Sequence, residues 1–550
     1  MNKDTLFKIE KIKYYLLIAF VVIQPLLDIY YLYTDKIVNS IGFSPSTIIR
    51  ICITAVLSIL TLITLKDKKR WMIIILYCLL ICIYMTIHVI NAENFHSLVP
   101  GNFGYSLKGE VFYIFRMMIP LAILFITYNL DLKEADFEKS ITAILLLIAG
   151  TIVITNVLKI SLNSYTNEPI KANIFGWFMG AYEKYNYSSL ASKGIFNFAN
   201  QIAALLVLLL PVMLSIYANK QKIINLITVL ITILAMIMLG TKVALFGAVV
   251  NIVVFIGILI FIRIFKKQNT LNKKNLLMII LSLIVIGGLF MKSPAINREI
   301  VARYVRINNS KIEVEGVDSK KKETIDNKIE PRSLNDGQLK NSEAVENKSI
   351  DDLRNKGMDK VSQPNKNDKK SMMEYIEKNY ENLMVNEQFI KQSYPYQYDP
   401  EFWVDIINLP VVERLNWRNL EQKMLQRVMD INDNKMDKYF GLTFTRTQNI
   451  FNLERDFLSQ YYSLGIVGVL LILGPYVILA LICFFKMIFK FKDKLNTTNA
   501  SLTYAILFAL AVSYYSGNVL DALTVTIILA FILGYLTSLV FQKTVDEKGK

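Results

Sequence analysis

Long apolar runs recur along the whole chain and constrain its fold more than any other feature. A run of about 17–25 apolar residues is long enough to cross the roughly 30 Å hydrocarbon core of a bilayer as a helix. Inside lipid, backbone polar groups need partners within their own segment, which favours helices. The runs lie at residues 14–33, 47–65, 71–90, 111–129, 141–160, 200–218, 223–239, 242–262, 275–292, 461–485, 502–519 and 522–541. The sequence therefore predicts an all-α polytopic membrane protein with about twelve transmembrane helices.

Lysine and arginine are distributed unevenly between the gaps that separate these runs. Taking the gaps alternately, one set holds most of the basic residues, with clusters at 66–70, 263–274 and 486–494. Cytoplasmic loops of membrane proteins carry an excess of Lys and Arg. The bias predicts that both termini lie in the cytoplasm and that residues 293–460 lie outside the cell membrane. Topology thus accounts for the net charge of +16, and we expect no nucleic-acid partner.

The gap at 293–460 is the one large loop of the predicted topology. Its segment 308–372 has no aromatic side chain and many charged and amide side chains, so we expect it to be disordered. Aromatic residues return in 373–460, where the spacing of Leu420, Met424 and Val428 predicts helical structure. The predicted parts are a nine-helix N-terminal membrane domain (1–292), the extracytoplasmic loop (293–460), three C-terminal helices (461–541) and a cytoplasmic tail (542–550).

Polar side chains gather toward the outer ends of the predicted helices. Charges at the bilayer centre are costly, so such residues usually face water or a polar cavity. A transporter tends to place its site near the midplane, whereas an enzyme acting on a lipid headgroup needs its site at headgroup level. The clustering favours the enzyme, although Asp28 and Arg50 are also open to interpretation as a structural ion pair. The residues concerned are Asp28, Arg50, Arg116, Asn200, Lys242, Glu454, Asp456 and Asn518.

Cations at this depth suit a pyrophosphate, because Arg offers planar bidentate hydrogen bonds and Lys a compact charge. Metal chemistry has little support in the sequence. The stretch at 430–435 begins like a calcium loop but has Lys435 where the sharp turn needs Gly. We also find no Gly-rich phosphate loop, so neither a metal nor a cofactor is predicted.

Three stretches follow one another in an informative order. They are K-G-I-F-N-F-A-N-Q-I-A-A at Lys193–Ala204, L-G-T-K-V-A-L at Leu239–Leu245, and N-L-E-R-D-F-L and its continuation at Asn452–Pro475. In this order, with one large loop before the third, they resemble the O-antigen ligase and polymerase superfamily from the fifth helix onward. Its members are integral membrane glycosyltransferases that use polyprenyl-pyrophosphate-linked glycans. The resemblance implies a GT-C-like architecture and an undecaprenyl-pyrophosphate-type donor.

The third stretch departs from the pattern of the Gram-negative ligases. Those ligases carry a His four residues before the Leu of the motif, where this chain has Glu454. Glu454 with Asp456 forms an E-x-D-F pattern that resembles the Gram-positive members. A carboxylate can accept a proton from an acceptor hydroxyl, which is the role of a general base. The resemblance further implies that an arginine of the large loop, Arg414 or Arg418, helps to hold the pyrophosphate.

These features predict transfer of a glycan from a polyprenyl pyrophosphate to a glycan or cell-wall acceptor at the outer face of the cytoplasmic membrane. Glu454 or Asp456 would activate the acceptor, and cationic residues would neutralise the departing pyrophosphate. The predicted pyrophosphate-binding residues are Lys242, Arg116, Arg418, Arg414 and Arg50, with Asn200, Asp28 and Asn518 in support. Two alternatives stay open: a repeat-unit polymerase with the same chemistry, and a glycolipid transporter or flippase with none.

Overall fold

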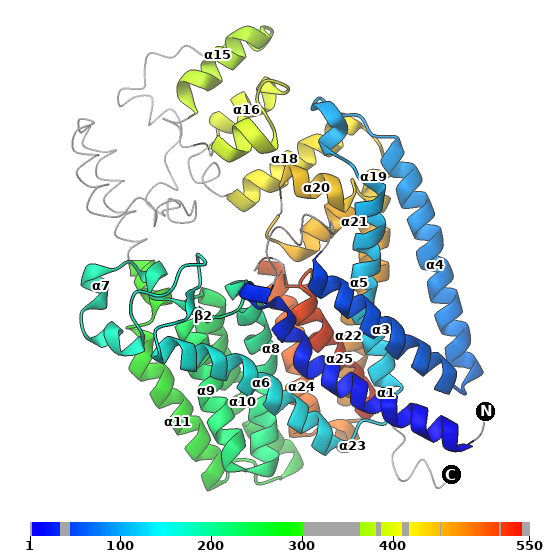
Figure 1. Cartoon of the computed structure of the whole chain (residues 1–550), viewed down its shortest axis with the longest axis vertical. Coiled ribbons are helices and arrows are strands. Elements are labelled where there is room, and N and C mark those ends of the chain that lie inside the picture. Colours follow the sequence, from blue (N-terminus) through cyan, green and yellow to red (C-terminus); the bar gives the residue numbers. More distant parts are fainter. Residues whose placement is uncertain are drawn as a thin grey trace. The chain divides into compact units, whose positions relative to one another are not determined.

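Helices make up nearly all of the regular structure in the described part of the chain (Figure 1). The structure is a computed structural model that describes residues 3–32, 44–300, 364–409 without 381–384 and 386, and 417–541 without 452, 516 and 518. In these residues the only sheet is an antiparallel pair, β1 (Leu162–Asn163) with β2 (Ser192–Gly194). The chain divides into two compact units. The first comprises Met1–Ile81, Phe112–Asn297 and Leu470–Lys550, and the second Cys82–Val111 and Arg298–Val469.

The first unit contains most of the long apolar helices. They are α1 (Lys3–Ile23), α3 (Pro45–Thr64), α6 (Glu134–Val157), α8 (Ala199–Lys220), α9 (Ile223–Met238), α10 (Lys242–Lys266), α11 (Lys273–Phe290), α22 (Gly474–Phe489), α24 (Thr497–Tyr515) and α25 (Leu523–Phe541), with the short α7 (Ala181–Lys184) and α23 (Phe491–Lys494). Three helices begin in one unit and end in the other: α4 (Lys68–Glu93), α5 (Leu107–Tyr128) and α21 (Asp456–Ile472).

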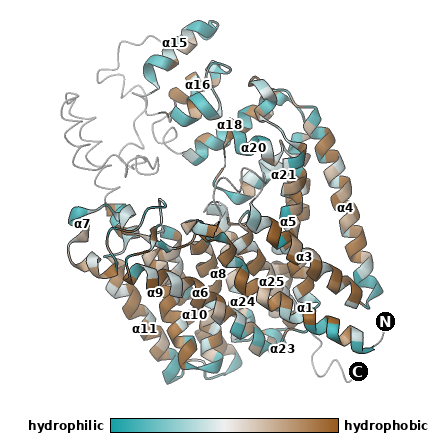
Figure 2. Ribbon diagram, viewed as in Figure 1, coloured by the Kyte–Doolittle hydropathy of each residue, from teal (hydrophilic) through white to brown (hydrophobic). Residues whose placement is uncertain are grey.

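The burial of the apolar helices shows which of them form the core. In α8 and α25, 89% of the most apolar 18-residue window is buried, against 17% in α4. The outward side chains of α4 include Met72, Ile75 and Leu79, and Figure 2 shows this helix as hydrophobic along its length. Water would disfavour such a surface, whereas lipid accommodates it. We conclude that α8 and α25 lie inside a helical bundle and that α4 faces the membrane.

Nine segments of the described residues are long and apolar enough to cross a membrane, which confirms an all-α, multi-pass membrane protein. The number of twelve spans and the GT-C-like arrangement stay predictions. Two boundaries differ from those expected. The first run is α-helical only to Ile23 and continues as 3₁₀ turns at Gln24–Asp28 and Tyr30–Leu32, because Pro25 cannot continue the α-helical hydrogen bonds. The run at 461–485 is broken before Pro475 into α21 and α22.

The second unit consists mainly of short helices packed around aromatic and aliphatic side chains. After the ends of α4 and α5 it contains α15 (Lys369–Asn379), the π-helical turn Gln388–Ser393, α16 (Pro400–Ile407), α18 (Trp417–Asn432), α19 (Asp437–Phe440) and α20 (Phe444–Ile450). Its core includes Phe389, Trp403 and Met424. Leu420, Met424 and Val428 lie on the buried face of α18, which confirms the helical spacing. Most of the segment expected to be disordered, 308–363, lies outside the described residues, and α15 begins at Lys369, before the predicted boundary at 373.

Candidate functional site

Glu454 lies beside an arginine of α18 in the second unit. Arg418 Nη2 donates a hydrogen bond to Glu454 Oε2 at 2.8 Å. The Arg418 side chain is 26% exposed and the Glu454 side chain 45% exposed. An ion pair this exposed contributes little to stability, typically about 0–1 kcal/mol. Both side chains are thus partly accessible, and the structure brings together two residues that the sequence placed in one candidate site.

Glu421 lies one turn after Arg418 on α18 and was missed by the sequence analysis. Its side chain is almost fully buried, and its Oε2 atom has no hydrogen-bond partner among the described residues. Burial, and then the charge of Glu454, raise the pKa of Glu421 to about 9, while Arg418 opposes the shift. Glu421 therefore carries a proton at neutral pH. Its three-residue spacing from Arg418 was the only sequence signal that could have pointed to it.

Asp456 differs from Glu454 in its environment although the two are close in sequence. It is the first residue of α21 and only 1% exposed. An acidic side chain in the first turn of a helix is favourable because it opposes the positive end of the helix dipole. Between them, Arg455 donates to Gln422 Oε1 at 3.3 Å and Asn419 Oδ1 at 3.1 Å, which attaches this segment to α18. Accessibility thus favours Glu454 over Asp456 for contact with a substrate.

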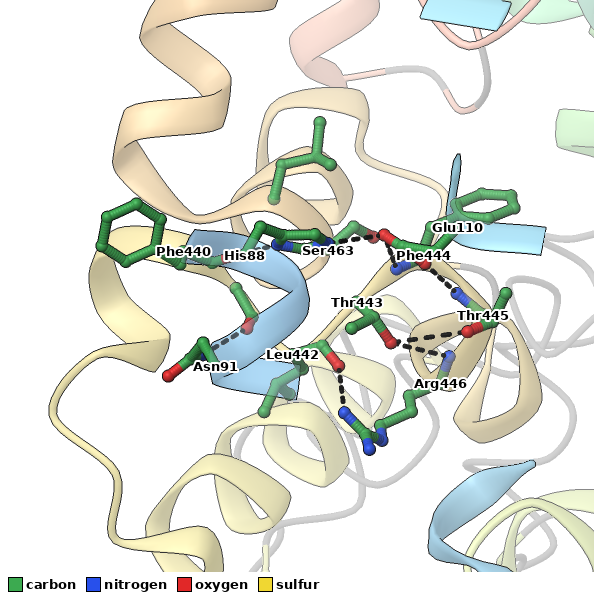
Figure 3. Close-up of polar contacts among 12 residues, drawn as sticks. His88, Asn91, Glu110, Phe440, Leu442, Thr443, Phe444, Thr445, Arg446 and Ser463 are labelled. Carbon is green, nitrogen blue, oxygen red and sulfur yellow. Dashed lines mark hydrogen bonds and ion pairs between the residues drawn. The ribbon is translucent and has the colours of Figure 1, made fainter. Parts of the chain in front are cut away.

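A buried pair, His88 and Glu110, holds the loop before α20 (Figure 3). His88 Nε2 lies 2.8 Å from Glu110 Oε1, and His88 Nδ1 lies 2.5 Å from the Phe440 carbonyl oxygen. Glu110 also accepts the backbone N–H groups of Phe444 at 3.0 Å and Thr445 at 3.2 Å. The two ring nitrogens of His88 thus face Glu110 Oε1 and the Phe440 carbonyl oxygen, which fixes the orientation of the imidazole. The pair fixes the first turn of α20.

The same loop crosses α21 through direct backbone contact. Leu442 N–H donates to the Tyr462 carbonyl at 2.7 Å, and Thr443 N–H donates to the Ser463 carbonyl at 3.1 Å. Gly465 has φ +68°, and a Cβ there would lie 2.3 Å from the Tyr439 carbonyl carbon. Only glycine permits so close an approach with this backbone conformation. The crossing fixes the helix that follows directly after Glu454.

Arg446 stabilises the other side of this loop without an acidic partner in its hydrogen bonds. Its guanidinium donates to the carbonyls of Ala92 at 2.8 Å and Leu442 at 3.3 Å. Its Cζ atom lies 4.0 Å from the centre of the Phe95 ring and 4.6 Å from that of Tyr105. Burial lowers the pKa of Arg446 to about 10. Two aromatic faces and a set of carbonyl oxygens compensate for its buried charge.

Asp28 and Arg50 form a bidentate ion pair in the first unit. Arg50 Nη1 donates to Asp28 Oδ1 at 3.0 Å and Nη2 donates to Oδ2 at 2.7 Å. Arg50 Nε donates to Gln24 Oε1 at 3.1 Å, and Nη2 also donates to the Thr524 hydroxyl at 3.2 Å. Every nitrogen of the guanidinium is occupied, and the side chain is 2% exposed. This geometry supports the interpretation of Asp28 and Arg50 as a structural ion pair.

Arg116 is paired as well, but it is less enclosed. Its two terminal nitrogens donate to the Asp521 carboxylate at 3.1–3.3 Å and to the Asp521 carbonyl. The side chain is 19% exposed, and its Cζ atom lies 5.8 Å from the centre of the Tyr113 ring. Asp28 is close enough to interact electrostatically with Arg116. Of the two arginines, Arg116 is better placed to meet an anionic ligand.

The remaining predicted residues of the first unit lie at helix starts. Lys242 is the first residue of α10, where Thr241 Oγ1 accepts the Ala244 N–H at 3.2 Å, and Asn200 lies in the first turn of α8. Both side chains are exposed. A helix start attracts anions through its unpaired N–H groups. Arg414 and Asn518 lie outside the described residues.

Lys193 belongs to the first of the three quoted stretches but was not among the predicted site residues. It is buried, and its Nζ donates to Asn167 Oδ1 and to the Asn197 carbonyl, both at 2.9 Å. Burial lowers the pKa of Lys193 to about 8. The Asn197 N–H in turn donates to the Asp28 carbonyl at 3.2 Å, so this stretch is attached to the segment that carries Asp28.

Comparison with known proteins identifies one family. A family model described as O-antigen ligase like membrane protein matches residues 10–542. No curated protein and no solved structure matches the chain. Because the family match spans nearly the whole chain, from α1 to the end of α25, the resemblance seen in three short stretches is confirmed: the protein belongs to the family of O-antigen ligase like membrane proteins.

Proposed function

We propose that this protein transfers a glycan from a polyprenyl pyrophosphate to a glycan or cell-wall acceptor at the outer face of the cytoplasmic membrane. The observation that carries the proposal is the exposed Arg418–Glu454 pair in a chain of the O-antigen ligase like family. An accessible carboxylate oriented by an arginine is suited to accept a proton from an acceptor hydroxyl. The family membership supports a lipid-linked glycan as the donor.

In the proposed reaction, Glu454 removes the proton from the acceptor hydroxyl as its oxygen attacks the anomeric carbon of the donor sugar. The bond between that carbon and the pyrophosphate oxygen breaks, and the polyprenyl pyrophosphate leaves with the electron pair. Arg418 orients Glu454 through their 2.8 Å hydrogen bond. Glu421 stays protonated, since two adjacent anionic carboxylates would repel each other. Glu454 is then the base of this carboxyl pair.

The pyrophosphate requires cations that stabilise its growing negative charge. In the second unit we assign this role to Arg418, with Arg414 as a further loop arginine. Arg116 and Lys242 of the first unit stay candidates from the sequence, and their side chains are more accessible than that of Arg50. Arg50 instead holds Asp28 and, through Thr524, the start of α25.

The deciding experiment uses the full-length protein in liposomes with a lipid-linked oligosaccharide and an acceptor glycan. Glu454→Gln removes the base without changing the size of the side chain, and release of polyprenyl pyrophosphate should fall at least about 100-fold. Glu401→Gln is the matched control, because Glu401 is an exposed carboxylate of the same unit that also pairs with an arginine, Arg427, at 3.3 Å. Transfer by Glu454→Gln at the rate of the unmodified protein would show the proposal to be wrong.

The alternatives predict different outcomes in the same assay. A repeat-unit polymerase has the same chemistry, and only the accepted glycan differs. A flippase would move the lipid-linked glycan between leaflets without releasing pyrophosphate, and Glu454→Gln would leave that movement unchanged. Measuring pyrophosphate release and leaflet exchange side by side therefore separates the enzyme from the transporter.

A further inference from the structure

A second polar site lies in the first unit, at the opposite ends of the helices that carry Arg50, Arg116 and Thr524. It is a pocket of about 470 Å³ whose lining includes Glu10, Lys13, Arg70, Tyr128, Asp131 and Ser538. Thr524 and Ser538 are separated by 14 residues of α25, which correspond to about 21 Å along the helix axis. The two polar sites are thus separated by much of a bilayer, and in the predicted topology the pocket faces the cytoplasmic headgroups.

Lys13 gives the pocket a buried cation. Its side chain lies on α1, the residue is 5% exposed, and its Nζ donates to Thr64 Oγ1 at 2.8 Å. An ammonium has three donors, and this hydrogen bond to a neutral hydroxyl uses one of them, while Glu10 on the same helix adds an electrostatic attraction. Lys13 therefore favours an anion in the pocket.

Arg70 supplies a second cation from a different helix. It lies at the start of α4, donates to Asn129 Oδ1, and lies 5.1 Å from the centre of the Tyr128 ring. Its ion pair with Asp67 is 3.4 Å long and exposed on both sides. Two cations from separate helices at the wall of one pocket suit a phosphate group, which can accept hydrogen bonds from both.

The pocket also offers sites for a positive group. Glu10 and Asp131 are exposed carboxylates in its wall. Helices α5 and α25 end here, and the carbonyl ends of helices favour cations. A ligand that fits both features carries a phosphate and a primary ammonium a few bonds apart. Phe541 also lines the pocket and provides apolar surface for the part that follows the headgroup.

We propose that this pocket binds the phosphoethanolamine headgroup of a membrane phospholipid, with the phosphate between Lys13 and Arg70 and the ammonium toward Glu10 and Asp131. The bound lipid joins α1, α4, α5 and α25 at the end of the bundle remote from Arg50. This site is independent of the glycan-transfer proposal, since none of its residues belongs to the predicted catalytic or pyrophosphate-binding set.

The test is native mass spectrometry and thermal unfolding of the full-length protein in detergent. The probes are phosphatidylethanolamine, phosphatidylglycerol, which lacks the ammonium, and phosphatidylcholine, whose ammonium cannot donate a hydrogen bond. Phosphatidylethanolamine should be retained preferentially and raise the melting temperature. Arg70→Met should weaken its binding about ten-fold, as expected for loss of a charge-assisted hydrogen bond. Lys69→Met, an exposed neighbour outside the pocket, is the matched control.

Because Lys13 is buried, Lys13→Met could disturb folding, so its lipid binding is compared only if the variant remains monodisperse. Arg70 is more exposed, and Arg70→Met therefore tests the site without that condition. Equal binding of the three lipids, or unchanged phosphatidylethanolamine binding in Arg70→Met, would overturn the proposal. A further arm uses soluble glycerophosphoethanolamine. If this compound raised the melting temperature and the lipid did not, the pocket would be a site for a soluble phosphate ester. That result would also overturn the proposal of a lipid site.

Discussion

Two arginine–carboxylate pairs in this molecule have nearly the same length and very different surroundings. The shortest contact is 2.7 Å in the Arg50–Asp28 pair of the first unit and 2.8 Å in the Arg418–Glu454 pair of the second. Arg50 is buried and makes further hydrogen bonds to Gln24 and Thr524. Arg418 and Glu454 are both partly exposed. Length alone therefore does not distinguish the two pairs, whereas burial does, and from this difference we propose that the first pair is structural and the second functional.

The largest effect that we expect is on the stability of the buried pair. Arg50→Met leaves the Asp28 carboxylate and the Gln24 side chain without their main partner, and removing one member of a buried pair typically costs about 3–5 kcal/mol. The free energy of unfolding, or the melting temperature in detergent, measures this loss. Lys366→Met is the control, because it breaks an exposed 3.0 Å pair with Asp405. If Arg50→Met had the melting temperature of the unmodified protein, the Arg50–Asp28 pair would not stabilise the fold more than the exposed pair does.

A somewhat smaller loss of stability is expected for a substitution at Gly465, where the loop before α20 crosses α21. A methyl group on Gly465 would lie 2.3 Å from the Tyr439 carbonyl carbon, and its φ of +68° disfavours any L side chain. Gly465→Ala should therefore cost about 2–3 kcal/mol. Gly257→Ala serves as the control, because a Cβ added at this position in α10 meets no heavy atom within 4 Å beyond the local backbone of its own helix. That control should be neutral or slightly stabilising. Equal melting temperatures for the two variants would contradict the backbone crossing.

The protonated carboxyl beside the exposed pair predicts a pH dependence. The pKa of Glu421 is about 9 in the folded protein and about 4.5 when unfolded, so between these values the folded state binds one more proton. Stability is thus greatest at low pH in this window and falls as the pH rises toward 9. Between pH 6 and 8 the loss is roughly 2–3 kcal/mol. Glu421→Gln should abolish this part of the dependence, and melting temperatures measured across pH would show it. An unchanged slope would contradict a buried, protonated Glu421.

Much of the helical structure could be predicted because its signal is local. Apolar runs of membrane length correspond to the long helices, and the spacing of Leu420, Met424 and Val428 predicted the buried face of α18. The early end of α1 has a local cause as well, because Pro25 stops the α-helical hydrogen bonds.

The surroundings of the candidate residues could not be predicted, because they depend on contacts between distant segments. One of the hydrogen-bond acceptors of the Arg50 guanidinium is Thr524, 474 residues further along the chain. His88 meets Phe440 across 352 residues. Nothing in the local sequence indicates that Glu421 and Asp456 are buried while Glu454 is exposed. The sequence could therefore propose which residues form the site, but not which of them a substrate can reach.

The smallest effect on stability, and the sharpest test of the comparison, is expected for Arg418→Met. An ion pair this exposed contributes about 0–1 kcal/mol, so the melting temperature should barely change. Glycan transfer should nevertheless fall about 10- to 100-fold, because a hydrogen bond to a charged group is worth about 1.5–3 kcal/mol. If Arg418 acted only by orienting Glu454, the double variant Arg418→Met/Glu454→Gln would lose no more activity than Glu454→Gln alone, whereas its proposed contact with the pyrophosphate predicts a further loss. An Arg418→Met protein that melts as early as Arg50→Met, or transfers glycan at the full rate, would place both pairs in the same structural class.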